Sequence, residues 1–250
     1  DSRSTKDARN LLRDPVVHVR SQTAAALGQY GNDDVLEEFG ALCNEEHEVD
    51  AVVLSAIEGL QRSQRIKAVN ILTSILLHPR QNIQNAVIAA LGTKTRSEEI
   101  TELVQILKDA TGEMRQQIMR GFFAMGEAAE APLLELLKED IASLRPHITG
   151  VLEETGCVDS WVRALSHRNP ENRMQAAETL SLIGTAAAYR GIVVAARDPD
   201  SNVRVMVTKA LEKLAGKDGK EILNQLQEDP DRRIRKYTFW ALERIKAGKE

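Results

Sequence analysis

Apolar residues recur with helical spacing along almost the whole chain, in segments that repeat about every 31 residues. Arg20, in the segment DPVVHVRSQTAAALGQYG at 14–31, is a convenient reference position for aligning these segments. Equivalent positions follow at intervals of 28 to 34 residues, and six of the eight are arginine. They are Arg20, Asp50, Gln84, Arg115, Arg145, Arg173, Arg204 and Arg235.

Positions at a fixed distance from the reference position hold similar residue types in the eight segments. The residue seven positions later is always apolar, the residue just before is apolar in seven of eight, and the residue six positions later is nearly always small. Offsets of −1, +3 and +7 follow the 3.6-residue period of a helix. Each segment is therefore predicted to be an amphipathic helix of about four turns, the second helix of its repeat, with these offsets facing the core.

Turn residues mark the expected ends of the second helices. An acid, amide or His before Pro can cap free N–H groups while Pro occupies the first turn. Such pairs stand at Asp14-Pro15, His78-Pro79, Asn169-Pro170, Asp198-Pro199 and Asp229-Pro230. Glycine tolerates the left-handed backbone of a helix stop, and the predicted stops are Gly31, Gly126, Gly156 and Gly184.

A shorter apolar-periodic stretch fills the gap between successive second helices. Examples are 98–108, 131–138 and 221–226, each predicted to be the first helix of a repeat. No strand pattern occurs, so the predicted class is all-α, with 5–12 as a truncated first helix. Residues 216–220, GKDGK, lack the spacing and the Ser or Thr of a phosphate-binding loop and are predicted to form a turn.

The segments RDPVVHVRSQTAAALGQYG at 13–31 and RDPDSNVRVMVTKALEKLAG at 197–216 resemble the short HEAT repeat of phycobilin-lyase-like proteins. The resemblance covers nearly the whole chain, although the reference Arg is missing at Asp50 and Gln84. It implies a right-handed α-α superhelix of about eight repeats over residues 1–250. It also implies that second helices line a concave surface. Because residue 1 is Asp, we expect a fragment of a longer protein.

The composition argues against several classes of function but does not identify one. Lys plus Arg is 33 and Asp plus Glu is 37, a formal charge of −4, which argues against a phosphate-binding surface. Cys43 and Cys157 are far apart, and no two histidines have metal-pair spacing, so neither a disulfide, a metal nor a cofactor is predicted. No run of 18 apolar residues suggests membrane insertion, and a cytoplasmic protein is expected.

The arginine column has two interpretations. A row of cations could bind phosphate or carboxylate, but in related repeats this Arg bonds turns and acids, here Asp14, Asp109, Asp198 and Asp229. We therefore assign the column to a structural ladder. Its members are Arg20, Arg115, Arg145, Arg173, Arg204 and Arg235.

Offsets +1, +5 and +8 form the stripe predicted to face outward from the second helices. The stripe is small and nearly neutral in the first half, for example Ser21 and Gly28, and becomes large and charged in the second half. Large exposed side chains are typical anchors for a protein partner. The predicted partner-binding residues, on or beside this stripe, are Arg120, Phe123, Met174, Glu178, Val205, Lys209, Lys236, Tyr237 and Trp240.

Alternatives remain for these apolar residues. They could be core residues if the register is shifted by one, or Tyr237, Phe239 and Trp240 could face a further repeat. No catalytic residue is predicted, because adjacent acids such as Glu153-Glu154 diverge around a helix and no nucleophile motif occurs.

The sequence is compatible with three functions. A non-enzymatic scaffold or adaptor that binds a protein on the concave face fits the regular repeat best. The resemblance makes a phycobilin lyase or phycobilisome-degradation factor the alternative. A DNA glycosylase of the HEAT-like alkylpurine class would need a basic groove, and here Lys and Glu are mixed.

Overall fold

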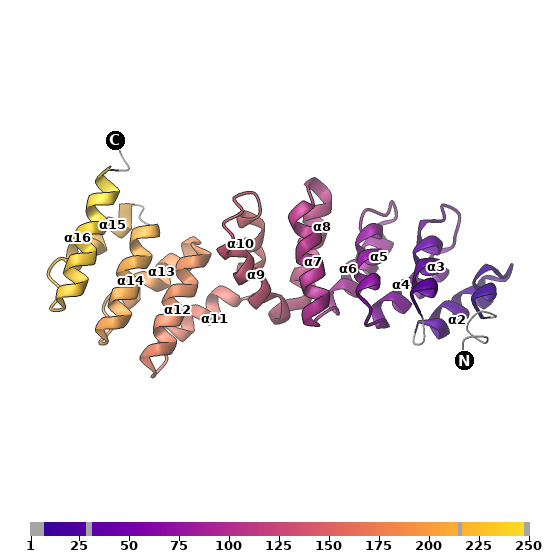
Figure 1. Ribbon diagram of the computed structural model, residues 1–250, viewed down its shortest axis with the longest axis horizontal. Helices are drawn as coiled ribbons and strands as arrows, with labels where there is room; N and C mark the ends of the chain where they lie inside the picture. Colours follow the sequence, from indigo (N-terminus) through magenta and orange to yellow (C-terminus); the bar gives the residue numbers. More distant parts are fainter. Residues whose placement is uncertain (1–7, 29–31, 215–216, 248–250) are drawn as a thin grey trace. The chain divides into compact units, whose positions relative to one another are not determined.

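The computed structural model describes residues 8–28, 32–214 and 217–247, and within these ranges the chain is helical with no strand. The chain divides into two compact units, the N-terminal unit Asp1–Pro132 and the C-terminal unit Leu133–Glu250 (Figure 1). None of the described helices is long and apolar enough to cross a membrane. The all-α class predicted from the repeat pattern is confirmed.

Alternating first and second helices build both units. The N-terminal unit contains η1 (Leu11–Arg13), α2 (Val17–Leu27), α3 (Asp33–Asn44), α4 (Asp50–Arg62), α5 (Ile66–Ile75), α6 (Gln81–Gly92), α7 (Ser97–Asp109), α8 (Gly112–Met125) and η2 (Gly126–Ala129). The division between the two units falls within helix α9 (Glu130–Lys138). The C-terminal unit continues with α10 (Arg145–Glu154), α11 (Cys157–Ala164), α12 (Pro170–Ile183), α13 (Ala186–Ala195), α14 (Ser201–Leu214), α15 (Lys217–Leu226) and α16 (Arg232–Ala247).

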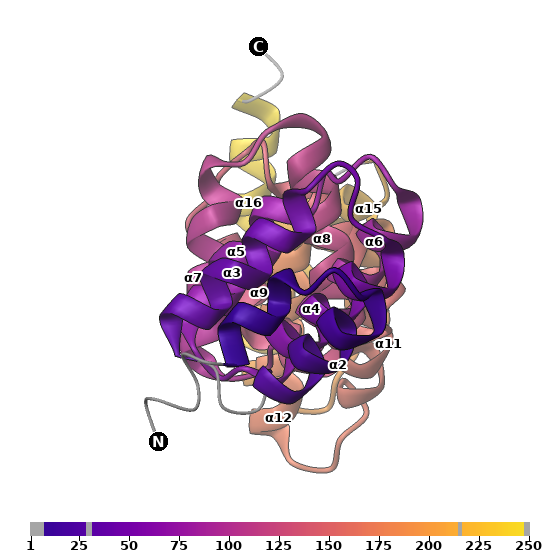
Figure 2. The ribbon, with the colours of Figure 1, turned by 90° about the vertical axis from the view of Figure 1, so that its right-hand side faces the viewer.

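Second helices stack on second helices within each unit. In the N-terminal unit α2, α4, α6 and α8 contact one another in order, and α3, α5 and α7 form a second row. The end-on view of Figure 2 shows these two rows on opposite sides. In the C-terminal unit α12, α14 and α16 form one row, and α11 contacts α13 in the other. Each unit is therefore built from successive helix pairs that stack along two rows.

The predicted core stripe is confirmed at two of its three offsets. The residues at +3 and +7 are buried in all eight second helices, from Thr23 and Leu27 in α2 to Thr238 and Leu242 in α16. The offset −1 is less uniform, because Val49 is 40% exposed and Asn172 is exposed. Val49 precedes α4 in extended backbone, which takes its side chain off the helical stripe.

Helices that follow an Asp-Pro pair begin two residues later than predicted. The carboxylate of Asp198 accepts a hydrogen bond from the Asp200 amide, a local turn that comes before α14. Asp200 then caps the helix by accepting from the amide of Asn202 at 2.7 Å. Asn169, in contrast, caps α12 as predicted, with Pro170 as its first residue.

Three of the predicted glycine stops adopt positive φ. The values are 59° at Gly126, 80° at Gly156 and 72° at Gly184, a region that costs glycine little. The turn predicted at 216–220 is wrong, because α15 already begins at Lys217. Gly31, Gly216 and part of the helix predicted over 5–12 lie outside the described residues.

Helices α2 and α4 approach closely at two glycines. A Cβ built on Gly28 would lie 2.5 Å from the Cα of Gly59, and a Cβ on Gly59 would collide with the ring of Phe39. Gly28 is buried by this contact, so its prediction as an outward-facing residue is wrong. The backbones of α2 and α4 can approach because neither glycine has a side chain to hold them apart. Position +8 of α2 therefore faces the neighbouring repeat.

Gly28→Ala tests this close approach. We expect a loss of about 1–3 kcal/mol in the free energy of unfolding, because the new methyl group meets rigid backbone. Gly150 in α10 is the matched control, since a Cβ there meets no atom within 4 Å. Gly150→Ala should stabilise by about 0.5–1 kcal/mol through reduced chain entropy. Urea unfolding followed by circular dichroism measures both, and equal effects of the two changes would contradict the packing.

Candidate functional site

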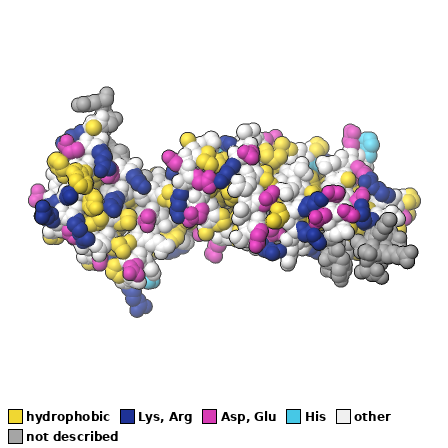
Figure 3. Space-filling model, viewed as in Figure 1, with side chains coloured by type: hydrophobic (Ala, Val, Ile, Leu, Met, Phe, Trp, Pro, Cys, Tyr) yellow, Lys and Arg dark blue, Asp and Glu magenta, His cyan; other side chains and the backbone are white. Residues whose placement is uncertain are grey.

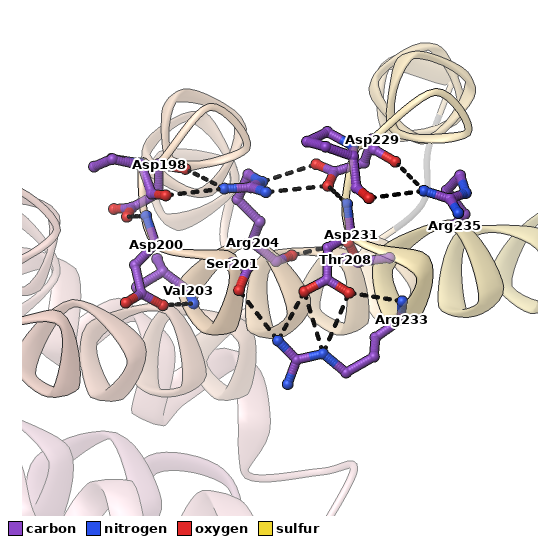
Figure 4. A network of polar contacts seen from close by, with 12 residues as sticks. Asp198, Asp200, Ser201, Val203, Arg204, Thr208, Asp229, Asp231, Arg233 and Arg235 are labelled. Carbon is purple, nitrogen blue, oxygen red and sulfur yellow. Dashed lines mark hydrogen bonds and ion pairs between the residues drawn. The ribbon is translucent and has the colours of Figure 1, made fainter.

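Arg173 and Arg204 each join two successive repeats through the same arrangement of hydrogen bonds. The Nη1 atom of Arg204 donates to the carbonyls of Asp198 and Pro199, which hold the guanidinium in place. Its Nε and Nη2 atoms then donate to both carboxylate oxygens of Asp229 at 2.8 and 3.0 Å (Figure 4). Arg173 binds Asp198 in the same way at 2.7 and 2.8 Å. We call this arrangement the guanidinium fork.

The fork recurs near the N-terminal side of the chain with a different acid. Arg20 donates through Nη1 to the carbonyls of Asp14 and Pro15, and through Nε and Nη2 to Glu48. Glu48 precedes α4, so the bond again connects one repeat to the next. Gln84 occupies the reference position in α6 and keeps only the first half, a bond from Nε2 to the carbonyl of His78 at 2.8 Å.

At Asp50, where the reference arginine is missing, the ion pair between repeats is reversed: the later repeat supplies the cation and the earlier one the acid. Asp50, at the reference position of α4, accepts from Arg80 of the following repeat, and Asn82 donates to the same carboxylate at 2.5 Å. Arg80 also donates to the Glu48 carbonyl at 2.9 Å. Two repeats are therefore still linked, with the cation now supplied by the later one.

Arg115 and Arg145 lie in a different setting from the fork residues. Arg115 donates to the Ala110 carbonyl at 3.0 Å. Arg145 donates through Nη1 to the carbonyl of Leu182 at 2.9 Å, at the end of α12. In both residues, as in the forks, the guanidinium hydrogen-bonds a backbone carbonyl, which fits a positioning role better than an open cation.

The acids of the forks are held ionised. Burial, the largest single effect, would by itself raise the pKa of Asp198 and of Asp229. The hydrogen bonds from Arg173 and Arg204, those from the amides of Asp200 and Asp231, and the nearby positive charge together outweigh it. The pKa of both carboxyl groups therefore lies below its usual range. The pKa of Asp231, which caps α16, is lowered by its hydrogen bonds with Arg233.

A buried lysine was missed by the sequence reasoning. Lys94 is 2% exposed, and its Nζ donates to the carbonyls of Gln61 and Ser63 while lying 3.6 Å from the carboxylate of Glu99. Burial lowers its pKa, and Glu99 partly offsets the shift. Lys94 ties the turn after α4 to the turn after α6, and no periodic column singles it out in the sequence.

None of the predicted partner-binding residues is buried. Six are exposed, while Met174, Val205 and Tyr237 are partly exposed. In the N-terminal unit, Arg120 bonds Gln117 and Asn85, and Phe123 lies nearby on α8 with 47% of its surface exposed. In the C-terminal unit the others lie on α12 (Met174, Glu178), α14 (Val205, Lys209) and α16 (Lys236, Tyr237, Trp240).

Four of these residues form a cluster across α14 and α16, which we call the cation–aromatic cluster: Lys209, Lys236, Tyr237 and Trp240. The Tyr237 and Trp240 rings meet edge to face with centroids 6.0 Å apart. Lys209 Nζ lies 5.2 Å from the Tyr237 centroid, and Lys236 Nζ lies 4.6 Å from that of Trp240. Both distances allow a cation–π attraction.

The surroundings of the cluster leave its cations available. Glu212 on α14 pairs with Arg244, and Glu243 on α16 pairs with Lys246, so each acid already has a cation of its own. Trp240 remains 40% exposed. Figure 3 shows hydrophobic side chains gathered over α14 and α16 with Lys and Arg beside them. The arrangement can accept an apolar group and a carboxylate side by side.

Comparison with protein-family models and with curated proteins finds no match. Among solved structures, the chain is similar to human deoxyhypusine hydroxylase in complex with glycerol, at 16% identity and TM-score 0.39 over 96% of this chain and 95% of that one. It is also similar to the complex of CpcE and CpcF of phycocyanin lyase from Nostoc, at 16% identity and TM-score 0.37 over 88% and 92%. The Pds5-Scc1 complex matches at 15% identity and TM-score 0.46 over 94% and 49%.

The bidentate bond of Arg204 to Asp229 predicts a pH-dependent stability. Asp229→Asn should cost about 2 kcal/mol near neutral pH, because a largely buried guanidinium loses its charged partner. Since the pKa of Asp229 is lowered by folding, this contribution is present above about pH 4 and disappears as the pH falls through the folded value. Urea unfolding at several pH values measures the difference between variant and parent.

Glu243→Gln is the control for that experiment. It removes an exposed ion pair with Lys246 and should change the free energy of unfolding by less than about 0.5 kcal/mol. A cost for Asp229→Asn that is no larger, or that persists unchanged in acid, would contradict the role assigned to the fork.

Proposed function

We propose that the chain is an adaptor that binds a protein segment on the second helices of its C-terminal unit, centred on the cation–aromatic cluster. The observation that carries the proposal is the pair of rings, exposed at Trp240 and partly exposed at Tyr237, with a lysine over each. Trp and Tyr are enriched among the residues that dominate binding energy in protein interfaces. Met174 and Val205, partly exposed on α12 and α14, extend the apolar surface on the same row of helices.

The chemistry of the cluster specifies the kind of segment. An apolar side chain can cover the edge of Trp240, while an ammonium that lies over a ring still has N–H groups directed at solvent. A carboxylate next to the apolar side chain would accept these N–H groups. We therefore propose a partner segment in which an apolar residue stands beside Asp or Glu.

A protein segment fits this surface better than a nucleic acid. Glu178 on α12 is exposed, and the acids Glu212 and Glu243 flank the two lysines. A nucleic acid carries a negative phosphate at each nucleotide, and these carboxylates would repel it. A short peptide brings only one or two negative charges to the surface. Arg120 and Phe123 on α8 are proposed as a separate, secondary contact area of the N-terminal unit.

Selection of a random displayed-peptide library on the folded chain tests the proposal. We expect the selected peptides to share an apolar residue next to an acid. Their affinity should fall about tenfold or more for Trp240→Ala and for Lys236→Ala, because a truncated hot-spot residue costs about 1.4 kcal/mol or more.

Val194→Ala is the matched control, since Val194 is an apolar residue that is 78% exposed on the first helix α13. It should leave the affinity unchanged. Peptides that bind Trp240→Ala and Lys236→Ala as tightly as the parent would refute the proposed site. Peptides with no acid in their shared pattern would refute the proposed chemistry.

A further inference from the structure

The row of first helices opens between α13 and α15. In the N-terminal unit each first helix packs on the next, α3 on α5 and α5 on α7, and α11 packs on α13 in the same way. Among the described residues α13 and α15 have far less direct contact, although both pack against α14. Because two separated helices leave space between their side chains, this part of the C-terminal unit can hold a small molecule.

A cavity of about 340 Å³ lies at this opening. It is lined by Tyr189, Arg190 and Val193 of α13 and by Glu221 and Ile222 of α15. Tyr189 and Val193 are four residues apart and therefore lie on one side of α13. Most of the lining surface is apolar, and all five side chains are exposed or partly exposed. The volume falls within the range of small-molecule sites, toward its lower end.

One cation and one acid border the cavity without satisfying each other. Arg190 and Glu221 are both exposed, and no ion pair or side-chain hydrogen bond joins either of them to another described residue. A guanidinium binds a carboxylate through two parallel N–H···O bonds, and a carboxylate accepts N–H groups of an ammonium. Since both charges line the same small cavity, a ligand inside it lies within reach of both. The matching ligand has a carboxylate, an ammonium and an apolar body.

We propose that the cavity binds a free α-amino acid with an apolar side chain, such as leucine or phenylalanine. Its carboxylate binds the guanidinium of Arg190, and its ammonium binds the carboxylate of Glu221. Its side chain packs on Val193 and Ile222 and against the ring of Tyr189, which removes apolar surface of both partners from water. An α-amino acid carries its two charges and its side chain on one carbon, so that a single small molecule meets all of these residues.

Other occupants match the lining less well. A phosphate or a nucleotide brings several negative charges, which the carboxylate of Glu221 would repel. A purely apolar molecule would take water from Arg190 and Glu221 and give no partner in return. An apolar side chain of a protein segment would cover the same surface but would also leave both charges without a partner.

The cavity is separate from the proposed peptide site. It lies between the first helices α13 and α15, whereas the cation–aromatic cluster lies on the second helices α14 and α16. A failed peptide selection therefore leaves the amino acid site standing. Likewise, a chain that binds no amino acid leaves the peptide proposal standing.

Titration of the isotope-labelled chain with L-leucine, followed by NMR, tests the proposal. We expect saturable shifts of signals from α13 and α15, including the methyl groups of Val193 and Ile222. L-Leucine methyl ester lacks the carboxylate and N-acetyl-L-leucine lacks the ammonium. Each should bind about tenfold more weakly, because each loses one charged contact. Glycine keeps both charges but has no side chain, and it should bind more weakly than L-leucine as well.

Substitution of the two charged residues tests the placement of the ligand. Arg190→Gln and Glu221→Gln should each lower the affinity for L-leucine about tenfold, and both residues are exposed, so the fold should persist. Arg197→Gln and Glu228→Gln are the matched controls. Arg197 and Glu228 are exposed, stand two residues after the ends of α13 and α15, and do not line the cavity. Both control variants should bind L-leucine as the parent chain does.

Three results would overturn the proposal. The first is the absence of a saturable shift with both L-leucine and L-phenylalanine. The second is a control variant that weakens binding as much as Arg190→Gln. The third is equal binding of N-acetyl-L-leucinamide, which keeps the side chain and has neither charge. That result would mean that the cavity takes an apolar side chain of a protein segment, and it would contradict an amino acid ligand.

Discussion

The structure depends on one packing constraint: a single pair of short helices cannot bury its own apolar stripe. Packing against first helices and against other second helices covers the stripe, and the +3 and +7 columns are buried in all eight second helices. Small residues bring the helices close enough, most clearly where Gly28 meets Gly59. Stability is therefore shared between repeats, and a helix with one neighbour is incomplete.

The guanidinium fork adds direction to this stacking. An arginine is first held by carbonyls of its own repeat and then binds a carboxylate of the next one, so the donor lies in the earlier repeat and the acceptor in the later one. The second helices α14 and α16, which the fork of Arg204 helps to join, also carry the rings and lysines of the cation–aromatic cluster.

The repeat, the helix pairs and most of the core were predictable because each depends on a column that recurs along the chain. The inverted link from Arg80 to Asp50 was not, because a missing arginine does not reveal which neighbour replaces it. Lys94 was missed because a single buried cation has no periodic signature. The aspartate before proline was taken for a helix cap, whereas its own turn moves the cap to Asp200 two residues later. Among the candidate partner residues, the +5 column predicts that Lys209 and Trp240 face outward. The contacts between the rings and the lysines could not be predicted, because they depend on the three-dimensional positions of the side chains.

Native-state amide hydrogen exchange of the C-terminal unit in dilute solution tests the packing constraint most directly. Among the described second helices, α14 contacts both α12 and α16, whereas α16 contacts α14. If neighbours complete each second helix, the amides around Val207 and Leu211 in α14 should exchange more slowly than those around Thr238 and Leu242 in α16. Equal protection of the two helices, or greater protection of α16, would contradict the account.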